Sequence, residues 1–239
     1  MSPLSTTSVS IVLPVRQQAD HIAETLRQLH ASAVQLTSRL EMIAVVNGST
    51  DLSAQICRDM AEQCPGLRVL ELSVAGWGAA VLAGLAASTG EVVCYTNAAR
   101  TTALDLRNAI ALGLLNEGYA VKAQRRARDN LHRRIGSVIY NFEARALFGL
   151  ASWDLNGTPK VFPRSFGALF ELREQGDLVD LEWLVACSRH GYPLIELPII
   201  STRRHGGRST TGWVSAMRMY VGALALRRRL NAGPDAGAR

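Results

Sequence analysis

Short apolar runs recur along the first half of the chain, and each is followed by a segment whose apolar residues have helical spacing. The runs predict strands over 8–15, 41–46, 67–72, 92–96 and 119–122. The segments between them predict helices over 19–33, 52–64, 79–87 and 104–116. Apolar runs without alternation are typical of strands covered on both faces. Strands that alternate with helices predict an α/β fold, a Rossmann-like and mostly parallel sheet with helices on both faces.

The second half has a less regular pattern. It predicts helices over 135–150, 166–173 and 180–189, and a loop over 154–162 that enters a strand. A strand over 194–200 contains Pro198, which favours an edge position because proline cannot donate to a ladder. A final amphipathic helix over 213–230 is followed by a polar tail that we expect to be disordered. We therefore divide the chain into a main domain, 1–211, and a C-terminal helix with its tail, 212–239.

Charge is distributed unevenly between the two halves. Residues 1–119 hold 7 basic and 10 acidic side chains, whereas residues 120–239 hold 19 basic and 10 acidic ones, so the net charges are −3 and +9. This asymmetry indicates an anionic partner for the second half, such as a phosphate, an acidic membrane surface or nucleic acid. Arginine without interleaved stacking aromatics is a weak signal for nucleic acid, so we expect no nucleic-acid partner.

Cysteine usage and the chain start indicate where the protein works. Cys57, Cys64, Cys94 and Cys187 form no C-x-x-C pair, which favours buried, reduced thiols. The first residues lack the basic and apolar regions of a signal peptide. No apolar run approaches the roughly 20 residues that span a bilayer. We expect a cytoplasmic protein, or one peripheral to the inner face of the cell membrane.

The stretch from Gly76 to Thr101 joins a helix of small apolar residues to a buried strand that ends at Asn97. Ligands of open α/β sheets bind at the carboxyl ends of the strands. We therefore expect the chemistry of this protein to lie near Asn97.

Four segments occur in a recognisable order. They are VSIVLPV at 9–15, VNGSTD at 46–51, GWGAAVLAGLAASTGEVV at 76–93, and DLNGTPKVF at 154–162 followed by DLEWL and RRHGGRST. Together they resemble a family 2 glycosyltransferase of the GT-A fold, nearest to the dolichyl-phosphate mannose synthase-like branch, over residues 8–211. The resemblance implies transfer of a sugar from a nucleotide sugar to a polyprenyl phosphate or a similar anionic acceptor. It also implies Mg²⁺ or Mn²⁺ bound by an Asp-x-Asp pair, because hard cations prefer carboxylate oxygen.

The chain departs from that family pattern on the donor side. The two metal aspartates of the family correspond to Asn97 and Ala99, and the acidic pair after the second strand reads Val46-Asn47. The acidic positions after the first strand are also lost, and Arg16 stands there. In one interpretation arginines replace the metal in neutralising the diphosphate. In the other, the protein is a catalytically degenerate homologue with a binding or regulatory role.

The candidate residues for binding the nucleotide sugar surround the ends of these strands. They are Pro14, Val15, Arg16, Asn47, Gly48, Ser49, Gly78, Asn97, Ala98, Ala99 and Arg100, with no metal ligand among them. Asn97 is equally compatible with closing a turn. For Gly76 and Gly78, tight packing is the favoured interpretation over a backbone approach to phosphate.

The resemblance places the acceptor in the second half, where Lys160, Asp180 and Glu182 are the candidate catalytic residues. The chain has 24 arginines but two lysines, Lys122 and Lys160, so a retained ammonium at 160 suits a phosphate contact, with a surface lysine as the alternative. Asp180 and Glu182 are two apart on a helix and point in different directions. We expect Asp180 to organise the site, because a phosphate acceptor needs positioning more than deprotonation.

The candidate residues for binding the acceptor are mostly basic. They are Arg125, Asn156, Gly157, Arg203, Arg204 and Arg208, whereas a solvated basic face is nearly as good an interpretation for Arg126, Arg128 and Arg133. The final helix carries an apolar stripe that includes Trp213, Tyr220 and Leu224 and ends in three arginines at 227–229. This pattern suits an interfacial helix on anionic lipid, and equally a helix packed on the core.

Overall fold

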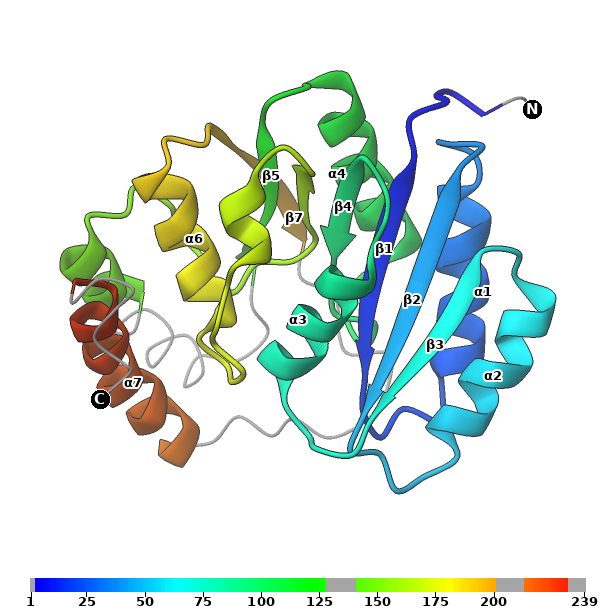
Figure 1. Cartoon of the computed structure of the whole chain (residues 1–239), viewed down its shortest axis with the longest axis horizontal. Coiled ribbons are helices and arrows are strands. Elements are labelled where there is room, and N and C mark those ends of the chain that lie inside the picture. Colours follow the sequence, from blue (N-terminus) through cyan, green and yellow to red (C-terminus); the bar gives the residue numbers. More distant parts are fainter. Residues whose placement is uncertain (1–2, 128–140, 201–212, 232–239) are drawn as a thin grey trace.

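The computed structural model describes residues 3–127, 141–200 and 213–231. Seven strands form one sheet with the order β3-β2-β1-β4-β6-β5-β7 (Figure 1). The strands are β1 (Val9–Val15), β2 (Leu40–Asn47), β3 (Leu67–Leu72), β4 (Val92–Tyr95), β5 (Ala120–Ala127), β6 (Lys160–Pro163) and β7 (Leu194–Ile200). β6 runs antiparallel to both of its neighbours, and every other pair is parallel. The prediction of a mostly parallel α/β sheet is confirmed.

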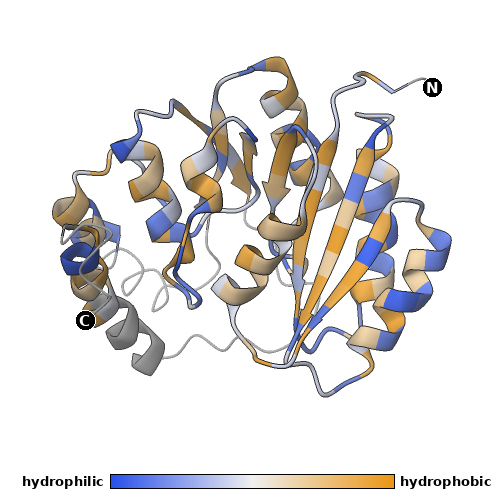
Figure 2. Cartoon of the chain, in the orientation of Figure 1, coloured by the Kyte–Doolittle hydropathy of each residue, from blue (hydrophilic) through white to orange (hydrophobic). Residues whose placement is uncertain are grey.

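Helices cover both faces of the sheet, as predicted. The helices are α1 (Ile22–Ala33), α2 (Ser53–Gln63), α3 (Trp77–Ala87), α4 (Ala103–Leu115), α6 (Val179–Arg189) and α7 (Trp213–Asn231), and residues 141–148 are also helical. Two separate apolar cores result, one shared by α1, α2 and α4 and the other by α3 and α6. In Figure 2 the strands are largely hydrophobic, which fits their burial between these two helical layers.

The first half folds as its periodicity indicates. β1 is buried along its whole length, which explains its apolar run without alternation. α3 approaches β1 very closely, since a Cβ added at Gly84 would lie 2.1 Å from Cγ1 of Val12. The small residues of α3 are therefore explained by packing on the sheet.

The second half differs from the prediction in one element. The helix expected over 166–173 is wrong, because only Gly167–Phe170 forms a single 3₁₀ turn (η1). The backbone N–H groups of Arg173 and Glu174 donate to Oε2 of Glu182, at 2.9 and 2.8 Å, rather than to a preceding turn. Residues 171–178 thus form a loop held by the side chain of a later helix. The expected edge strand is confirmed as β7, where Pro198 lies opposite Gln124.

The C-terminal helix α7 packs on the core through one face. Ala223 and Leu226 are buried in the same apolar core as α6, whereas Val221 and Leu224 are exposed on the other side. Within the described parts of the chain, no helix is both long and apolar enough to cross a bilayer.

All four cysteines are buried free thiols, as predicted. Burial raises the pKa of the Cys57 and Cys187 thiols to about 12. Such thiols are poor nucleophiles at neutral pH, because the thiolate is the reactive form.

Candidate active site

Neutral side-chain amides join the carboxyl ends of the strands on the candidate donor side. Asn47 is buried at the end of β2, and its Nδ2 donates to the carbonyl of Val15, at 3.0 Å. Its Oδ1 accepts from the backbone N–H of Gly76, at 3.1 Å. Asn47 thereby connects β1, β2 and the start of α3. An aspartate could not make the bond to Val15, since an ionised carboxylate only accepts.

Gln17 joins the two loops that follow β1 and β2. Its Oε1 accepts from the backbone N–H of Thr50, at 2.8 Å, and its Nε2 donates to Oγ1 of the same residue, at 3.0 Å. Its own N–H donates to Oγ of Ser49, at 3.2 Å. Arg16 lies beside it with an exposed side chain. The sequence did not predict the hydrogen bonds between these two loops. The side chain of Gln17 and the hydroxyls of Ser49 and Thr50 were the signals available in the sequence.

Asn97 closes a turn after β4, which confirms that interpretation of the residue. Its Oδ1 accepts from the backbone N–H of Ala99, at 2.9 Å, and its carbonyl accepts from the N–H groups of Arg100 and Thr101. Ala98 and Ala99 are buried, and Arg100 is half-buried. A ligand role for Asn97 stays a prediction.

The residues at the end of β4 do not fit a divalent cation. Asn97 and Ala99 replace the two carboxylates that the resemblance implies, and the amide oxygen of Asn97 already accepts a backbone bond. Within the described ranges, no group of three or more His, Cys, Asp or Glu side chains could hold a metal ion. Mg²⁺ is commonly bound by one or two carboxylates together with substrate phosphates, and the turn from Asn97 to Arg100 supplies no carboxylate. We therefore derive no chemical step through a metal at this site.

The glycines that precede and begin α3 are explained by packing. A Cβ at Gly78 would lie 2.3 Å from the carbonyl oxygen of Glu174, and one at Gly76 would lie 2.9 Å from that of Gln175. The N–H of Ala79 donates to the Gln175 carbonyl, at 2.9 Å. The loop over 171–178 therefore sits directly against the N-terminus of α3, as the packing interpretation requires.

Asp180 forms the centre of a buried cluster. Oδ1 accepts from Nζ of Lys160 and from the hydroxyl of Tyr95, the latter at 2.9 Å, and Oδ2 accepts from Nε1 of Trp77, at 3.1 Å. Lys160 and Tyr95 lie opposite each other in the β4–β6 ladder. Trp77 and Tyr95 were missed by the sequence reasoning, because nothing local indicates a partner about a hundred residues away.

Burial sets the charge state of this cluster. The Lys160 side chain is 0% exposed, so the surface-lysine alternative is wrong. Burial lowers the pKa of the Lys160 ammonium, and Asp180 opposes that shift. Burial and the neighbouring Asp180 carboxylate raise the pKa of Tyr95 well above its usual range. With three donors on its carboxylate, Asp180 can organise the site but is not free to act as a general base. A phosphate contact by Lys160 stays a prediction.

Glu182 points away from Asp180, as the helical spacing predicts. Besides the two backbone N–H groups of the 171–178 loop, it accepts from Nη2 of Arg229 on α7, at 3.0 Å. The same guanidinium lies 3.0 Å from Glu174. Glu182 therefore connects α6, the loop that contacts α3, and the C-terminal helix.

Both lysines of the chain hold the loop that the resemblance assigns to the acceptor side. Nζ of Lys122 donates to the carbonyls of Trp153 and Asp154, at 2.7 and 3.1 Å, and pairs with Glu196 at 3.0 Å. Nζ of Lys160 donates to the next carbonyl, that of Leu155, at 3.2 Å. Burial lowers the pKa of Lys122, against the influence of Glu196. The scarcity of lysine in the chain, which singled out Lys160 in the sequence, is an equally good signal for Lys122, and both side chains are buried.

Arg125 fixes the same loop by a paired contact with Asp154. Nε and Nη2 of Arg125 donate to the two carboxylate oxygens at 2.8 and 2.5 Å, and the Arg125 N–H adds a third bond. Burial opposes the Arg125 charge, but Asp154 outweighs it and raises the pKa of the guanidinium. Gly157 lies against β5, since a Cβ there would be 1.9 Å from the carbonyl oxygen of Ala123. Asn156 beside it is half-buried.

The structure thus brings the candidate residues together in two groups. On the donor side, Pro14 and Val15 are buried in β1, and Gly48, with φ of 55°, lies against Ala75. On the acceptor side, Lys160, Asp180, Arg125, Asn156 and Gly157 belong to one connected region around residues 153–157. Arg203, Arg204, Arg208, Arg128 and Arg133 lie outside the described residues.

Comparison with known proteins finds similarity to sugar transferases. Residues 10–99 match the model of Glycosyl transferase family 2. An undecaprenyl-phosphate 4-deoxy-4-formamido-L-arabinose transferase from Pseudomonas savastanoi pv. phaseolicola is 29% identical over 191 residues, which are 76% of this chain and 55% of that protein. The protein of the same name from Pseudomonas fluorescens is 27% identical over 219 residues, with 87% and 62% covered. The chain therefore spans somewhat more than half the length of these relatives.

Solved structures share the fold. Glucosyl-3-phosphoglycerate synthase from Mycobacterium tuberculosis, in complex with Mn²⁺, UDP and phosphoglyceric acid, superposes with a TM-score of 0.72 at 21% identity, covering 97% of this chain and 81% of that one. A mannosyltransferase from Pyrobaculum calidifontis, in complex with GDP-Man and Mn²⁺, gives 0.66 at 21% identity, with 95% and 66% covered. Residues 10–99 are thus similar to Glycosyl transferase family 2, and the chain shares the GT-A fold of these solved structures.

Proposed function

We propose that this protein transfers a sugar from a nucleotide-sugar donor to a polyprenyl phosphate, and that it does so without a divalent metal. The observation that carries the first part is the match over most of the chain to transferases named for undecaprenyl phosphate. The absence of carboxylates at Asn97 and Ala99 carries the second part. Neither the relatives nor the fold favours the degenerate alternative.

The donor diphosphate is expected at the ends of β1 and β4. These strands are neighbours in the sheet, Arg16 follows the first and Arg100 the second. A guanidinium carries a permanent charge and binds phosphate oxygens in a planar, paired geometry. Both arginines can therefore offset the charge that develops on the departing nucleoside diphosphate, in the role that a metal ion fills elsewhere.

The acceptor side needs no strong base. The bond between the anomeric carbon and the diphosphate breaks, its electron pair leaves with the nucleoside diphosphate, and an acceptor phosphate oxygen forms the new bond. That oxygen is already anionic near neutral pH, so positioning matters more than deprotonation. The carboxylates of Asp180 and Glu182 are both occupied by donors, which is consistent with this division of labour. We place the protein at the inner face of the cell membrane, where such an acceptor is found.

A transfer assay with a metal control tests the proposal. The full chain is incubated with labelled UDP- and GDP-sugars and undecaprenyl phosphate in detergent, with EDTA or with Mn²⁺. We expect transfer in EDTA and less than a twofold change on adding Mn²⁺. Strict metal dependence would overturn the metal-free part. Failure of transfer, together with no thermal stabilisation by any nucleoside diphosphate, would overturn the proposed function, since ligands that bind the folded state raise its stability.

Variants of the two arginines locate the donor site. Arg16→Gln and Arg100→Gln should each weaken binding of the nucleoside diphosphate by roughly tenfold, the value of one charge-assisted contact of about 1.5 kcal/mol. Arg107→Gln, on the exposed side of α4, is the matched control and should change nothing. Equal effects of all three substitutions would contradict the assignment.

A further inference from the structure

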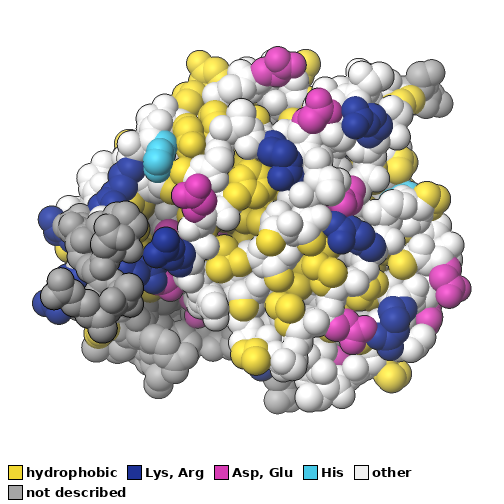
Figure 3. Space-filling view, in the orientation of Figure 1, with side chains coloured by type: hydrophobic (Ala, Val, Ile, Leu, Met, Phe, Trp, Pro, Cys, Tyr) yellow, Lys and Arg dark blue, Asp and Glu magenta, His cyan; other side chains and the backbone are white. Residues whose placement is uncertain are grey.

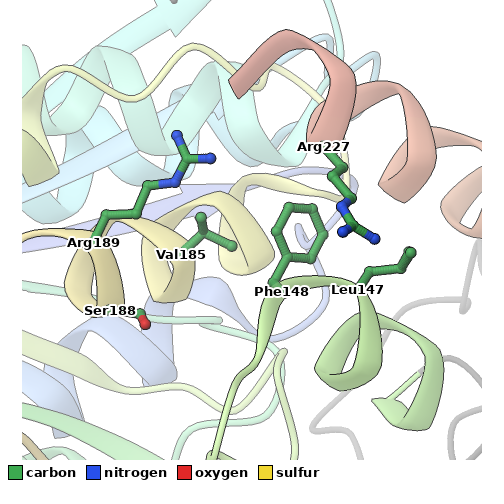
Figure 4. Close-up of a pocket in the computed structure, with 6 residues that line it drawn as sticks. All are labelled: Leu147, Phe148, Val185, Ser188, Arg189 and Arg227. Carbon is green, nitrogen blue, oxygen red and sulfur yellow. The ribbon is translucent and has the colours of Figure 1, made fainter. Parts of the chain in front are cut away.

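A pocket of about 200 Å³ lies where α6, the 141–148 helix and α7 meet. Its described lining is Leu147, Phe148, Val185, Ser188, Arg189 and Arg227 (Figure 4). In the close-up, the two arginines stand on either side of an apolar wall made by Val185 and Phe148. The pocket is separate from the candidate active site, which lies around the strand ends and residues 153–157.

The chemistry of the lining favours an anion. Nη1 of Arg189 donates to the carbonyl of Leu230, at 2.7 Å, which fixes this guanidinium at the C-terminal end of α6 against α7. Arg227 is exposed on α7. None of the described lining residues is acidic. Two guanidinium groups beside one small cavity can both donate to a phosphate, and hydrogen bonds between ions are about twice as strong as neutral ones.

The size of the pocket limits its occupant. Sites that enclose a whole small ligand have volumes of roughly 300–1,000 Å³. This pocket is smaller, so it can hold a charged headgroup while the rest of the molecule stays outside. The apolar wall of Val185 and Phe148 suits the carbon atoms next to such a group.

The surface beside the pocket favours a lipid as the source of that headgroup. Val221 is 59% exposed and Leu224 is 38% exposed on α7, and Arg228 is exposed on the same side at helical spacing. Basic side chains gather around α7 in the space-filling view (Figure 3). Exposed apolar residues next to arginines are the pattern of a helix that lies in an anionic membrane interface.

We propose that this pocket binds the phosphate headgroup of an anionic phospholipid and thereby seats α7 on the membrane surface. The proposal deepens the proposed function, on which its purpose rests, because it brings the active site to the layer that holds a polyprenyl phosphate. Binding itself is independent of sugar transfer.

Vesicle binding by the full chain tests the proposal. The vesicles contain phosphatidylcholine with or without phosphatidylglycerol, and bound protein is measured by flotation without any nucleotide. We expect binding to the anionic vesicles only. Arg227→Gln should weaken it by more than tenfold, and Arg228→Gln, next to the pocket but outside it, by no more than the roughly fivefold that one basic residue contributes near a charged membrane. Arg107→Gln, on the opposite side of the sheet, should have no effect.

Two further arms keep the result unambiguous. Ser188→Asp adds a carboxylate to the exposed rim and should weaken binding at least as much as Arg227→Gln, and circular dichroism of each variant confirms its fold. Equal losses for Arg227→Gln and Arg228→Gln would overturn the pocket in favour of a general basic face. Saturation by inorganic phosphate without any vesicle binding would overturn the lipid source. Nucleotide-induced thermal stabilisation, measured on the same samples, shows whether the proposed function has failed instead.

Discussion

The candidate donor side and the candidate acceptor side are held together mainly by different chemistry. Around the ends of β1 and β2 the loops are connected by two neutral amides, those of Gln17 and Asn47, and by the carboxylate of Asp51, which accepts from the N–H of Ala19. Around residues 153–157 and α6 the connections are ion pairs, formed by Lys160 with Asp180, Lys122 with Glu196, Arg125 with Asp154 and Arg229 with Glu182.

The difference bears on how each side would bind the ligand that we propose for it. The amides of Gln17 and Asn47 hold the candidate donor loops without a negative charge that would repel a diphosphate, and the carboxylate of Asp51 is held by the backbone N–H groups of Ala19 and Ser53. On the candidate acceptor side, each of these four cations is paired with a carboxylate, so the loop is held without a bound ligand. Removing one member of a buried pair leaves the other as an uncompensated charge, which makes the acceptor side the more sensitive of the two.

The largest effect is expected from Lys160→Met, which leaves Asp180 buried without its cation. We expect the free energy of unfolding to fall by about 3–5 kcal/mol, as for other broken buried pairs. Urea denaturation measures it, with the exposed Arg107→Gln as a control that should stay within about 0.5 kcal/mol. A loss below about 1 kcal/mol would show that this ion pair does not hold the acceptor side.

Gly157→Ala tests whether the acceptor loop is fixed by backbone fit as well as by charge. The added Cβ would lie 1.9 Å from the carbonyl oxygen of Ala123, and this backbone atom cannot move aside alone. Overpacking of this kind costs about 3 kcal/mol at the upper end of its usual range. Gly167→Ala is the matched control, because nothing lies within 4 Å of its added Cβ. Similar stability of the two variants in urea would show that the loop adapts.

Asn47→Asp adds a buried negative charge at the end of β2. The carboxylate cannot donate to Val15, and the buried carbonyl loses its partner, so stability should fall by about 2 kcal/mol. Thermal unfolding in the presence of a nucleoside diphosphate should also show a smaller stabilisation than the natural protein gives. The exposed Asn108→Asp on α4 controls for added charge alone. If the Asn47→Asp variant binds the nucleoside diphosphate as tightly as the natural protein, binding does not require an uncharged side chain at position 47.

The smallest effect is expected from Arg229→Gln. This variant compares the partly exposed pair of Arg229 and Glu182 with the buried pair of Lys160 and Asp180. The Arg229 side chain is 43% exposed, so water screens its charge, and the buried Glu182 keeps two backbone N–H donors when the guanidinium is removed. We expect less than about 1 kcal/mol in urea, well below the effect of Lys160→Met. An equal loss for the two variants would mean that burial does not set the strength of these pairs.

The first half of the fold was predictable because its signals are local. Apolar periodicity located β1 to β4 and the helices between them, and β1 shows why, since a strand covered on both faces has no polar positions. The position of β6 between β4 and β5 could not be predicted, because a four-residue strand carries no information about its partners. The loop that follows η1, in place of the predicted helix, is held by Glu182, a side chain later in the sequence.

The sequence indicated candidate site residues but not the contacts between them. The resemblance identified Lys160 and Asp180, yet their ion pair and complete burial were unexpected, since lysine is rarely buried unless it is paired. Trp77 and Tyr95 reach Asp180 from other elements, and only the folded chain shows this. Asn97 was the easier case, because asparagine has an intrinsic tendency to close turns.

The position of β6 also determines the order in which the sheet can be completed during synthesis. Strands β1 to β4 are all made before residue 96 and can pair with one another as they emerge. β5 emerges next, but its only neighbours in the described sheet are β6 and β7, so it must wait until residues 160–163 have been translated. For that interval the nascent chain exposes the open edge of β4 and an unpaired β5, both of which are sites where newly made chains aggregate.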